Sequence, residues 1–76
     1  MHVYQAIRTA AKRSGVSLIE IGPAMGHNKA YVSSMISTGR RPVYSTLARI
    51  LGASGYSLCA VPRGKEPKSA IVIDAD

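Results

Sequence analysis

The chain has 76 residues and a formal net charge of +6, from ten Lys and Arg against four Asp and Glu. This length predicts one domain with a modest core, and dimerisation is one way for so small a domain to bury more surface. A single cysteine, Cys59, excludes an internal disulfide, and no Cys/His cluster has zinc spacing. The sequence also lacks a secretory signal and an apolar run long enough to cross a bilayer, which predicts a cytoplasmic protein of bacterial or phage origin.

The positive charge is concentrated in the first part of the chain. Residues 1–55 hold seven Lys and Arg against Glu20 alone, whereas residues 56–76 hold three basic and three acidic residues. Such a field favours a polyanionic partner, of which nucleic acid is the commonest. The alternative is a basic surface that only keeps the chain in solution.

Two helices are predicted in the first third of the chain. Apolar residues recur at helical spacing over residues 3–13, and Ser14-Gly15 ends this segment. A second helix begins after Ser17, because Ser17 and Glu20 have the spacing of a capping box. Gly22-Pro23 lies inside this helix and predicts a kink or a short helix.

A third helix with two contrasting faces is predicted over residues 29–37. Gly26 belongs to the turn before it, and Asn28 is the expected N-cap. At about 100° per residue, the apolar side chains fall on one face: Tyr31, Val32, Met35 and Ile36. Small or basic side chains fall on the other: Lys29, Ala30, Ser33, Ser34 and Ser37. A basic loop, residues 39–42, follows, and a fourth helix is expected over residues 43–53.

The pattern changes after Gly55. The runs "YSLCAV" and "AIVID" are rich in β-forming residues and are separated by the loop "PRGKEPK". We therefore expect a pair of β-strands within residues 56–76, formed either as an intrachain hairpin or with a partner chain. This extension is a possible dimerisation element, distinct from the domain formed by residues 1–55.

The order of these elements resembles a known DNA-binding family. Two helices joined by a short Gly-containing turn, with another helix before them, form a helix-turn-helix, whose second helix lies in the major groove. Residues 3–55 resemble the Cro/C1-type (XRE family) domain of phage repressors and small bacterial regulators. The resemblance is carried by Gly15, Ser17, Ile21, Gly26, Val32, the Gly39–Pro42 loop, Leu47 and Leu51-Gly52. The chain departs from the family at Leu18, where Gln is frequent, and at Gly22, where alanine is common.

This resemblance implies both a fold and a function. The expected fold is mainly α, a four-helix lambda-repressor-like helix-turn-helix domain followed by the short pair of C-terminal β-strands. The expected function is a sequence-specific, double-stranded DNA-binding transcriptional regulator, acting as a repressor. It would place the third helix in the major groove as a homodimer, and it would be associated with the nucleoid when bound.

The resemblance also implies which residues contact DNA. The positions that read bases in the family fall on Asn28, Lys29, Ala30, Ser33 and Ser34. A lysine can donate to guanine, an alanine can pack on a thymine methyl group, and serine hydroxyls can donate or accept. In the loop where the family contacts the DNA backbone, Arg40 and Arg41 are assigned to phosphates. Weaker candidates for phosphate contact are His27, Ser37 and Thr38.

Other functions are less well supported by the residues. We find no catalytic grouping, no cofactor motif and no metal-ligand cluster, and therefore expect neither an enzyme nor a metalloprotein. The basic residues Arg8, Lys12 and Arg13 either approach DNA or form a solvated face. The alternative function is an antitoxin-like or other protein-interaction module, in which the tail strands bind a toxin or another partner protein.

Overall fold

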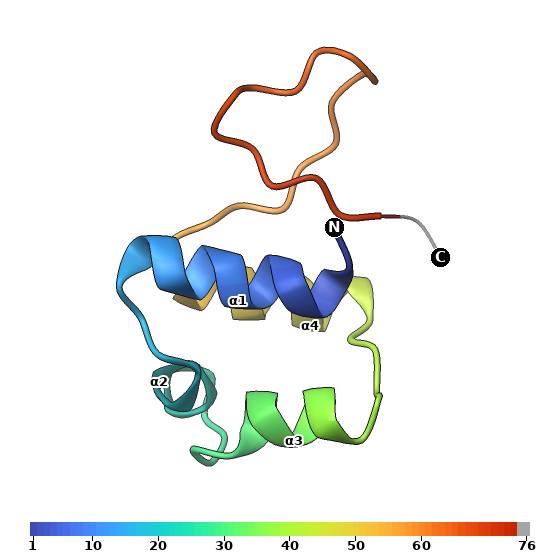
Figure 1. Ribbon diagram of the computed structural model, residues 1–76. Helices are drawn as coiled ribbons and strands as arrows, with labels where there is room; N and C mark the ends of the chain where they lie inside the picture. Colours follow the sequence, from blue (N-terminus) through green and yellow to red (C-terminus); the bar gives the residue numbers. More distant parts are fainter. Residues whose placement is uncertain (75–76) are drawn as a thin grey trace.

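The computed structural model describes residues 1–74 and contains four α-helices in these residues (Figure 1). They are α1 (Val3–Ser14), α2 (Leu18–Ala24), α3 (Tyr31–Ser37) and α4 (Tyr44–Ala53). α1 and α4 form a central layer, with α2 and α3 on one side of it and the tail, residues 57–74, on the other. Residues 75–76, the end of the predicted 56–76 extension, lie outside the described part of the chain. None of the described helices has both the length and the apolar character needed to cross a membrane.

Each of the four helices is followed, one or two residues after its last residue, by a glycine in the left-handed conformation. At the end of α2, Gly26 has φ 82°, and the His27 N–H donates to the Gly22 carbonyl oxygen at 2.8 Å. Together with the bond from the Gly26 N–H to the Pro23 carbonyl oxygen at 3.0 Å, this is a Schellman motif. The same motif follows the other helices, at Gly15, Gly39 and Gly55. The spacing of these glycines therefore sets the helix lengths.

Side-chain hydrogen bonds lie at the start of α2 and in the turn before α3. The Glu20 carboxylate accepts from the Ser17 N–H at 3.0 Å, one of the two bonds expected of the capping box. α2 retains Pro23 and ends one residue later, so it is a short helix. The Asn28 side-chain oxygen accepts from the Ala30 N–H at 3.0 Å and closes a turn over Lys29. α3 begins at Tyr31, two residues later than predicted, and its N-cap is Ala30 without a side-chain cap bond. The expectation that Asn28 is the N-cap is therefore wrong, because its side chain bonds within the preceding turn.

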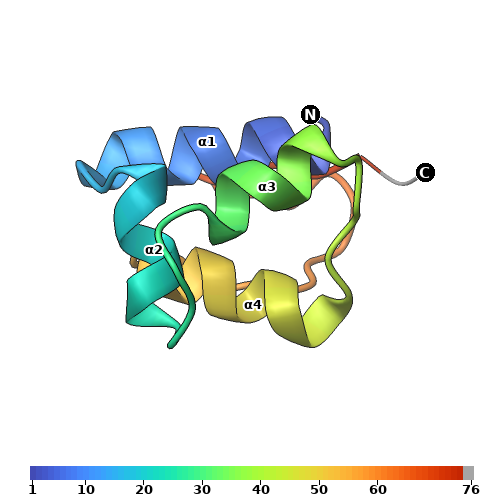
Figure 2. The same ribbon diagram turned by 90° about the horizontal axis from the view of Figure 1, so that it is seen from below.

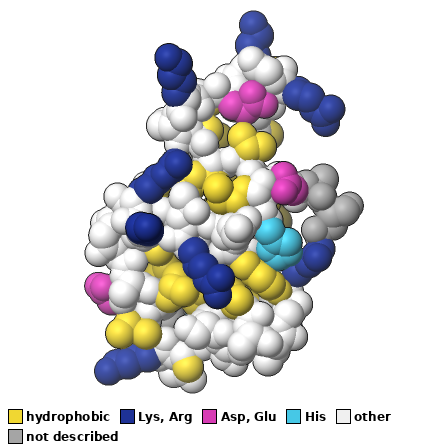
Figure 3. All heavy atoms as spheres, in the orientation of Figure 1, with side chains coloured by type: hydrophobic (Ala, Val, Ile, Leu, Met, Phe, Trp, Pro, Cys, Tyr) yellow, Lys and Arg dark blue, Asp and Glu magenta, His cyan; other side chains and the backbone are white. Residues whose placement is uncertain are grey.

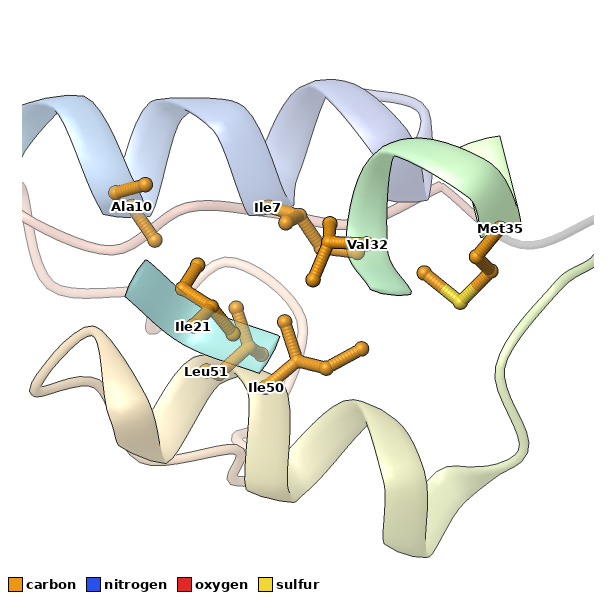
Figure 4. Packing of buried hydrophobic residues seen from close by; sticks show 8 residues of the cluster. Ile7, Ala10, Ile21, Val32, Met35, Ile50 and Leu51 are labelled. Atoms are coloured by element: carbon orange, nitrogen blue, oxygen red, sulfur yellow. The ribbon is translucent and has the colours of Figure 1, made fainter. Parts of the chain in front are cut away.

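All four helices contribute to one hydrophobic core (Figure 4). Ile7, Ile21, Val32 and Ile50, one from each helix, are all 0% exposed. Around them pack four further buried side chains: Ala10, Ala11, Met35 and Leu51. Val32 and Met35 belong to the apolar face that helical spacing predicts for residues 29–37, so periodicity identified the buried face of α3.

The prediction of two C-terminal β-strands is wrong. Within residues 1–74 the structure contains no strand, and residues 57–61 and 70–73 run as two limbs without hydrogen bonds to each other. Two successive turns separate the limbs, closed by bonds from Lys65 N–H to Pro62 and from Ala70 N–H to Pro67, both at 3.0 Å. This long connection holds the limbs apart, whereas a hairpin usually needs a loop of two to five residues. Residues with β propensity favour a pleated surface but do not by themselves provide a neighbouring strand.

The tail is fastened to the helices near its end. The Asp74 N–H donates to the Met1 carbonyl oxygen at 2.8 Å, and the Asp74 carboxylate lies 2.7 Å from the Met1 amino group. Ile71 and Ile73 pack against the core. These contacts close the tail into the ring seen above α1 in Figure 1.

Candidate nucleic-acid interface

α3 has one buried and one exposed face. Val32 is 0% and Met35 is 4% exposed, while Tyr31 and Ile36 are half-buried. Figure 2 views the molecule from the side of α3, and no other described helix lies in front of it. All ten residues predicted to contact DNA are exposed: His27, Asn28, Lys29, Ala30, Ser33, Ser34, Ser37, Thr38, Arg40 and Arg41.

The turn that leads into α3 packs directly against the backbone of α2. A Cβ atom added at Gly22 would lie 2.1 Å from the Asn28 carbonyl oxygen and 3.1 Å from the Tyr31 Cβ. Only glycine permits this approach. Gly22 therefore fixes the position of Asn28, Lys29 and Ala30 relative to α2.

The hydroxyl groups on the exposed face fall into two classes. The Ser37 hydroxyl donates to the Ser34 carbonyl oxygen at 3.2 Å, and the Thr38 hydroxyl donates to the same oxygen at 2.8 Å. In this arrangement neither presents its proton to a phosphate. By contrast, the hydroxyls of Ser33 and Ser34 have no hydrogen-bond partner within residues 1–74. The structure thus leaves the hydroxyls predicted to read bases available, and it engages those predicted to contact phosphates.

The His27 side chain is held beside the first turn of α3. Its ring stacks on the Tyr31 ring, with centroids 3.9 Å apart and planes 5° from parallel. Tyr31 is half-buried and so provides a supported surface for this stack. The imidazole is therefore positioned at the edge of the exposed face, two residues before Lys29 in the sequence.

The basic loop after α3 is braced from α1. The Arg40 N–H donates to the Met35 carbonyl oxygen at 3.0 Å, and the Arg40 carbonyl oxygen accepts from the Tyr4 hydroxyl at 2.7 Å. These two bonds hold the loop backbone while the side chains of Arg40 and Arg41 remain exposed. Sequence reasoning missed Tyr4, because this contact joins positions 36 residues apart and no local pattern marks it.

The charged side chains in and beside α3 are all basic. The chain has no Asp or Glu between Glu20 in α2 and Glu66 in the tail, so residues 21–65 contain no acidic residue. Lys29 precedes the exposed face of α3 and Arg40-Arg41 follows it. Arg13, by contrast, donates to the Ser69 carbonyl oxygen at 3.3 Å, and it is thereby directed toward the tail rather than α3.

The described residues offer little for other chemistry. Among residues 1–74, no group of three or more His, Cys, Asp or Glu side chains could hold a metal ion. The Glu66 carboxylate accepts from the Gly64 N–H through both oxygens at 3.1 Å. Hydrogen bonds from the backbone N–H groups of Glu66 itself and of Gly64 lower the pKa of this carboxyl below 4.5. Glu66 lies in the tail, on the opposite side of the central layer from α3.

Comparison of the chain with known protein families, curated proteins and solved structures finds no significant match. The geometry around α3 is therefore the basis for assigning a function. That geometry combines an exposed helix face of small side chains, available hydroxyls and flanking cations. Chemically, such a surface can approach a polyanion closely and offer it hydrogen bonds.

Proposed function

We propose that the chain is a sequence-specific, double-stranded DNA-binding transcriptional regulator, acting as a repressor, that places α3 in the major groove. The observation that carries the proposal is the exposed face of α3, where Ala30, Ser33 and Ser34 are small and Lys29 and Arg40-Arg41 lie at either end. Small side chains let a helix backbone approach base edges, and the flanking cations are suited to phosphates.

Each residue has a distinct role in this proposal. Lys29 donates to guanine O6 and N7, and Ala30 packs on a thymine methyl group. Ser33 and Ser34 bond base edges through their hydroxyls. The Asn28 side-chain oxygen is already occupied by the Ala30 N–H, so its amide NH₂ is the group that faces DNA. Arg40 and Arg41 contact phosphates beyond the C-terminal end of α3, and His27 contacts a phosphate near its N-terminal end. The hydroxyls of Ser37 and Thr38 would first have to rotate away from the Ser34 carbonyl oxygen before they could donate to a phosphate.

The proposed regulator acts as a homodimer on a two-fold symmetric operator in the cytoplasm and is nucleoid-associated when bound. Half-sites are then about 34 Å apart, near one helical turn of DNA. Lys29 is the one long side chain among the proposed base-reading residues. Direct readout is consequently sparse, and sequence-dependent DNA shape contributes to specificity.

The test begins with selection of preferred duplexes from a random-sequence pool, followed by fluorescence anisotropy over a range of salt concentrations. We expect an enriched two-fold motif. We also expect a slope of log K against log salt of about −2 per copy, because Arg40 and Arg41 each neutralise a phosphate and release its counterion. Failure to enrich any motif, or an affinity that is insensitive to salt, would contradict the proposal.

Charge-matched variants separate a defined interface from general attraction. Lys29→Ala should weaken binding to the selected duplex by about 1–3 kcal/mol if Lys29 reads a base, and it should relax specificity at one position. Lys65→Ala removes the same charge from the tail, on the far side of the central layer, and should leave binding nearly unchanged. Equal effects of the two substitutions would refute the assignment of α3 as the interface.

A second candidate function is an antitoxin-like or protein-interaction module that uses the tail. The exposed apolar side chains of Val61 and Val72 favour it, at 44% and 54% exposure. Binding of a different protein through the tail should be unaffected by Lys29→Ala and reduced by Val72→Glu. A stable complex with such a protein, without enrichment of any DNA motif, would favour this candidate over the first.

A further inference from the structure

We infer that the tail is the surface through which two copies of this chain associate, which deepens the proposed homodimer and rests on it. The tail and the central layer enclose a cavity of about 530 Å³. Its walls are mainly apolar and include Leu58, Ile71 and Ile73 from the limbs, with Ala6 and Leu51 at its base. Figure 3 shows hydrophobic side chains exposed between the tail and the helices.

An open apolar cavity of this size is unusual for a packed domain. Protein interiors are close-packed, with few voids larger than a water molecule, and apolar cavities bind water poorly. Val61 and Val72 line this cavity and are still 44% and 54% exposed. One copy therefore leaves contiguous apolar surface in contact with water, which is the usual mark of an interaction site.

The distribution of charge favours a second copy as the occupant. The chain carries a net charge of +6, so most pairings of two copies would bring Lys and Arg side chains together. Residues 50–62 are the longest stretch without Asp, Glu, Lys or Arg, and residues 69–73 are also uncharged. These two stretches contain both limbs of the tail. The basic residues of the tail, Arg63, Lys65 and Lys68, lie in the connection between the limbs. The limbs themselves are thus the uncharged, apolar surface on which two such cations can meet.

The position of the tail is compatible with DNA binding. It lies on the opposite side of the α1–α4 layer from α3 (Figure 1). A second copy docked on the limbs therefore leaves the exposed face of α3 uncovered. In the associated form, the apolar side chains of one copy, including Val61 and Val72, fill the cavity of the other.

Sedimentation velocity from micromolar to millimolar protein tests this inference. We expect a concentration-dependent shift to twice the 8.0 kDa mass of the chain. Val72→Glu should raise the dissociation constant by about a hundredfold, because each copy loses a buried valine and would bury a charge. The matched control is Ile19→Glu on α2, where the side chain is 57% exposed, and it should leave association unchanged.

Cys59 provides an independent probe without any substitution. It is the only cysteine, is exposed, and lines the cavity. Its alkylation by iodoacetamide should slow as the protein concentration rises through the association range, and it should not slow in Val72→Glu. A monomer mass with a constant alkylation rate at every concentration would overturn the inference. A small molecule retained on the monomer in native mass spectrometry, or a mass gain only with a different protein, would also overturn it.

These outcomes are distinguishable from failure of the proposed function. Val72→Glu should still bind DNA, with the salt slope reduced to about that of one copy. If the chain dimerises through the tail but enriches no DNA motif, the proposed function fails and the interface stands. If it binds a DNA motif as a monomer at all concentrations, the interface fails and DNA binding stands.

Discussion

Substitution of Gly22 by alanine should destabilise the protein, although alanine is the better helix former. In an unhindered helix the change would stabilise by about 0.8–1 kcal/mol. Here the added methyl carbon would lie 2.1 Å from the Asn28 carbonyl oxygen. A carbon–oxygen contact needs about 3.3 Å, so the turn must move by more than about 1 Å.

The net effect follows from the bonds that this movement disturbs. Overpacking in a buried site costs about 1–3 kcal/mol. Displacement of the turn also weakens the bond from the His27 N–H to the Gly22 carbonyl oxygen, which is worth about 1 kcal/mol. After the gain in helix propensity, we expect Gly22→Ala to lower the free energy of unfolding by about 1–3 kcal/mol.

Gly52 offers a matched control within the same chain. It lies inside α4, is exposed, and has no atom within 4 Å of an added Cβ. Gly52→Ala should therefore stabilise by about 0.5–1 kcal/mol. Urea unfolding followed by circular dichroism measures both variants. If Gly22→Ala proved as stable as Gly52→Ala, the close packing of the turn on α2 would be refuted. Because the turn positions α3, Gly22→Ala should also weaken DNA binding at temperatures where it remains folded.

Three further predictions concern hydrogen bonds to single side chains. Asn28→Ala removes the acceptor of the Ala30 N–H and should lower the free energy of unfolding by about 1 kcal/mol in urea. Tyr4→Phe removes the donor to the Arg40 carbonyl oxygen and should also lower stability by about 1 kcal/mol. It should weaken DNA binding with an unchanged salt slope, and a changed slope would contradict a bracing role. The Glu66 carboxyl, followed by NMR, should titrate with a midpoint below 4.5. Since folding lowers the pKa of Glu66, its carboxylate stabilises the folded state at a pH above the unfolded pKa, and this stabilisation is lost as the pH falls through the folded pKa. A midpoint that is not lowered would contradict the hydrogen bonds to this carboxylate.

Local sequence patterns predicted the helical part of the fold well. Glycine after each apolar repeat marked the helix ends, because the left-handed C′ position strongly favours that residue. The three- and four-residue spacing of apolar side chains identified the buried face of α3, which includes Val32 and Met35. The same angles predicted that Ser33 and Ser34 lie on the exposed face. These features depend on neighbours within one or two turns, and the sequence displays such neighbours directly.

The tail shows where local patterns are insufficient. Its two runs have the composition of strands, yet the limbs do not pair, because pairing depends on a connection that brings them together. Residues 62–69 instead form two turns that hold the limbs apart. The composition of these runs favours a pleated, half-buried surface, whereas in the structure residues 57–61 and 70–73 form no strands and do not pair.

By itself, the sequence determined the number of helices, the glycines that follow them, the buried face of α3 and the small, basic character of the segment around it. The tertiary structure alone decided that Gly22 lies against the Asn28 carbonyl and that Tyr4 supports Arg40. It also decided which serine hydroxyls remain available. The physical reason is range: helix ends and faces follow from contacts between residues a few positions apart. The placement of α3 and its flanking loop, by contrast, depends on atoms brought together only when the four helices pack around one core.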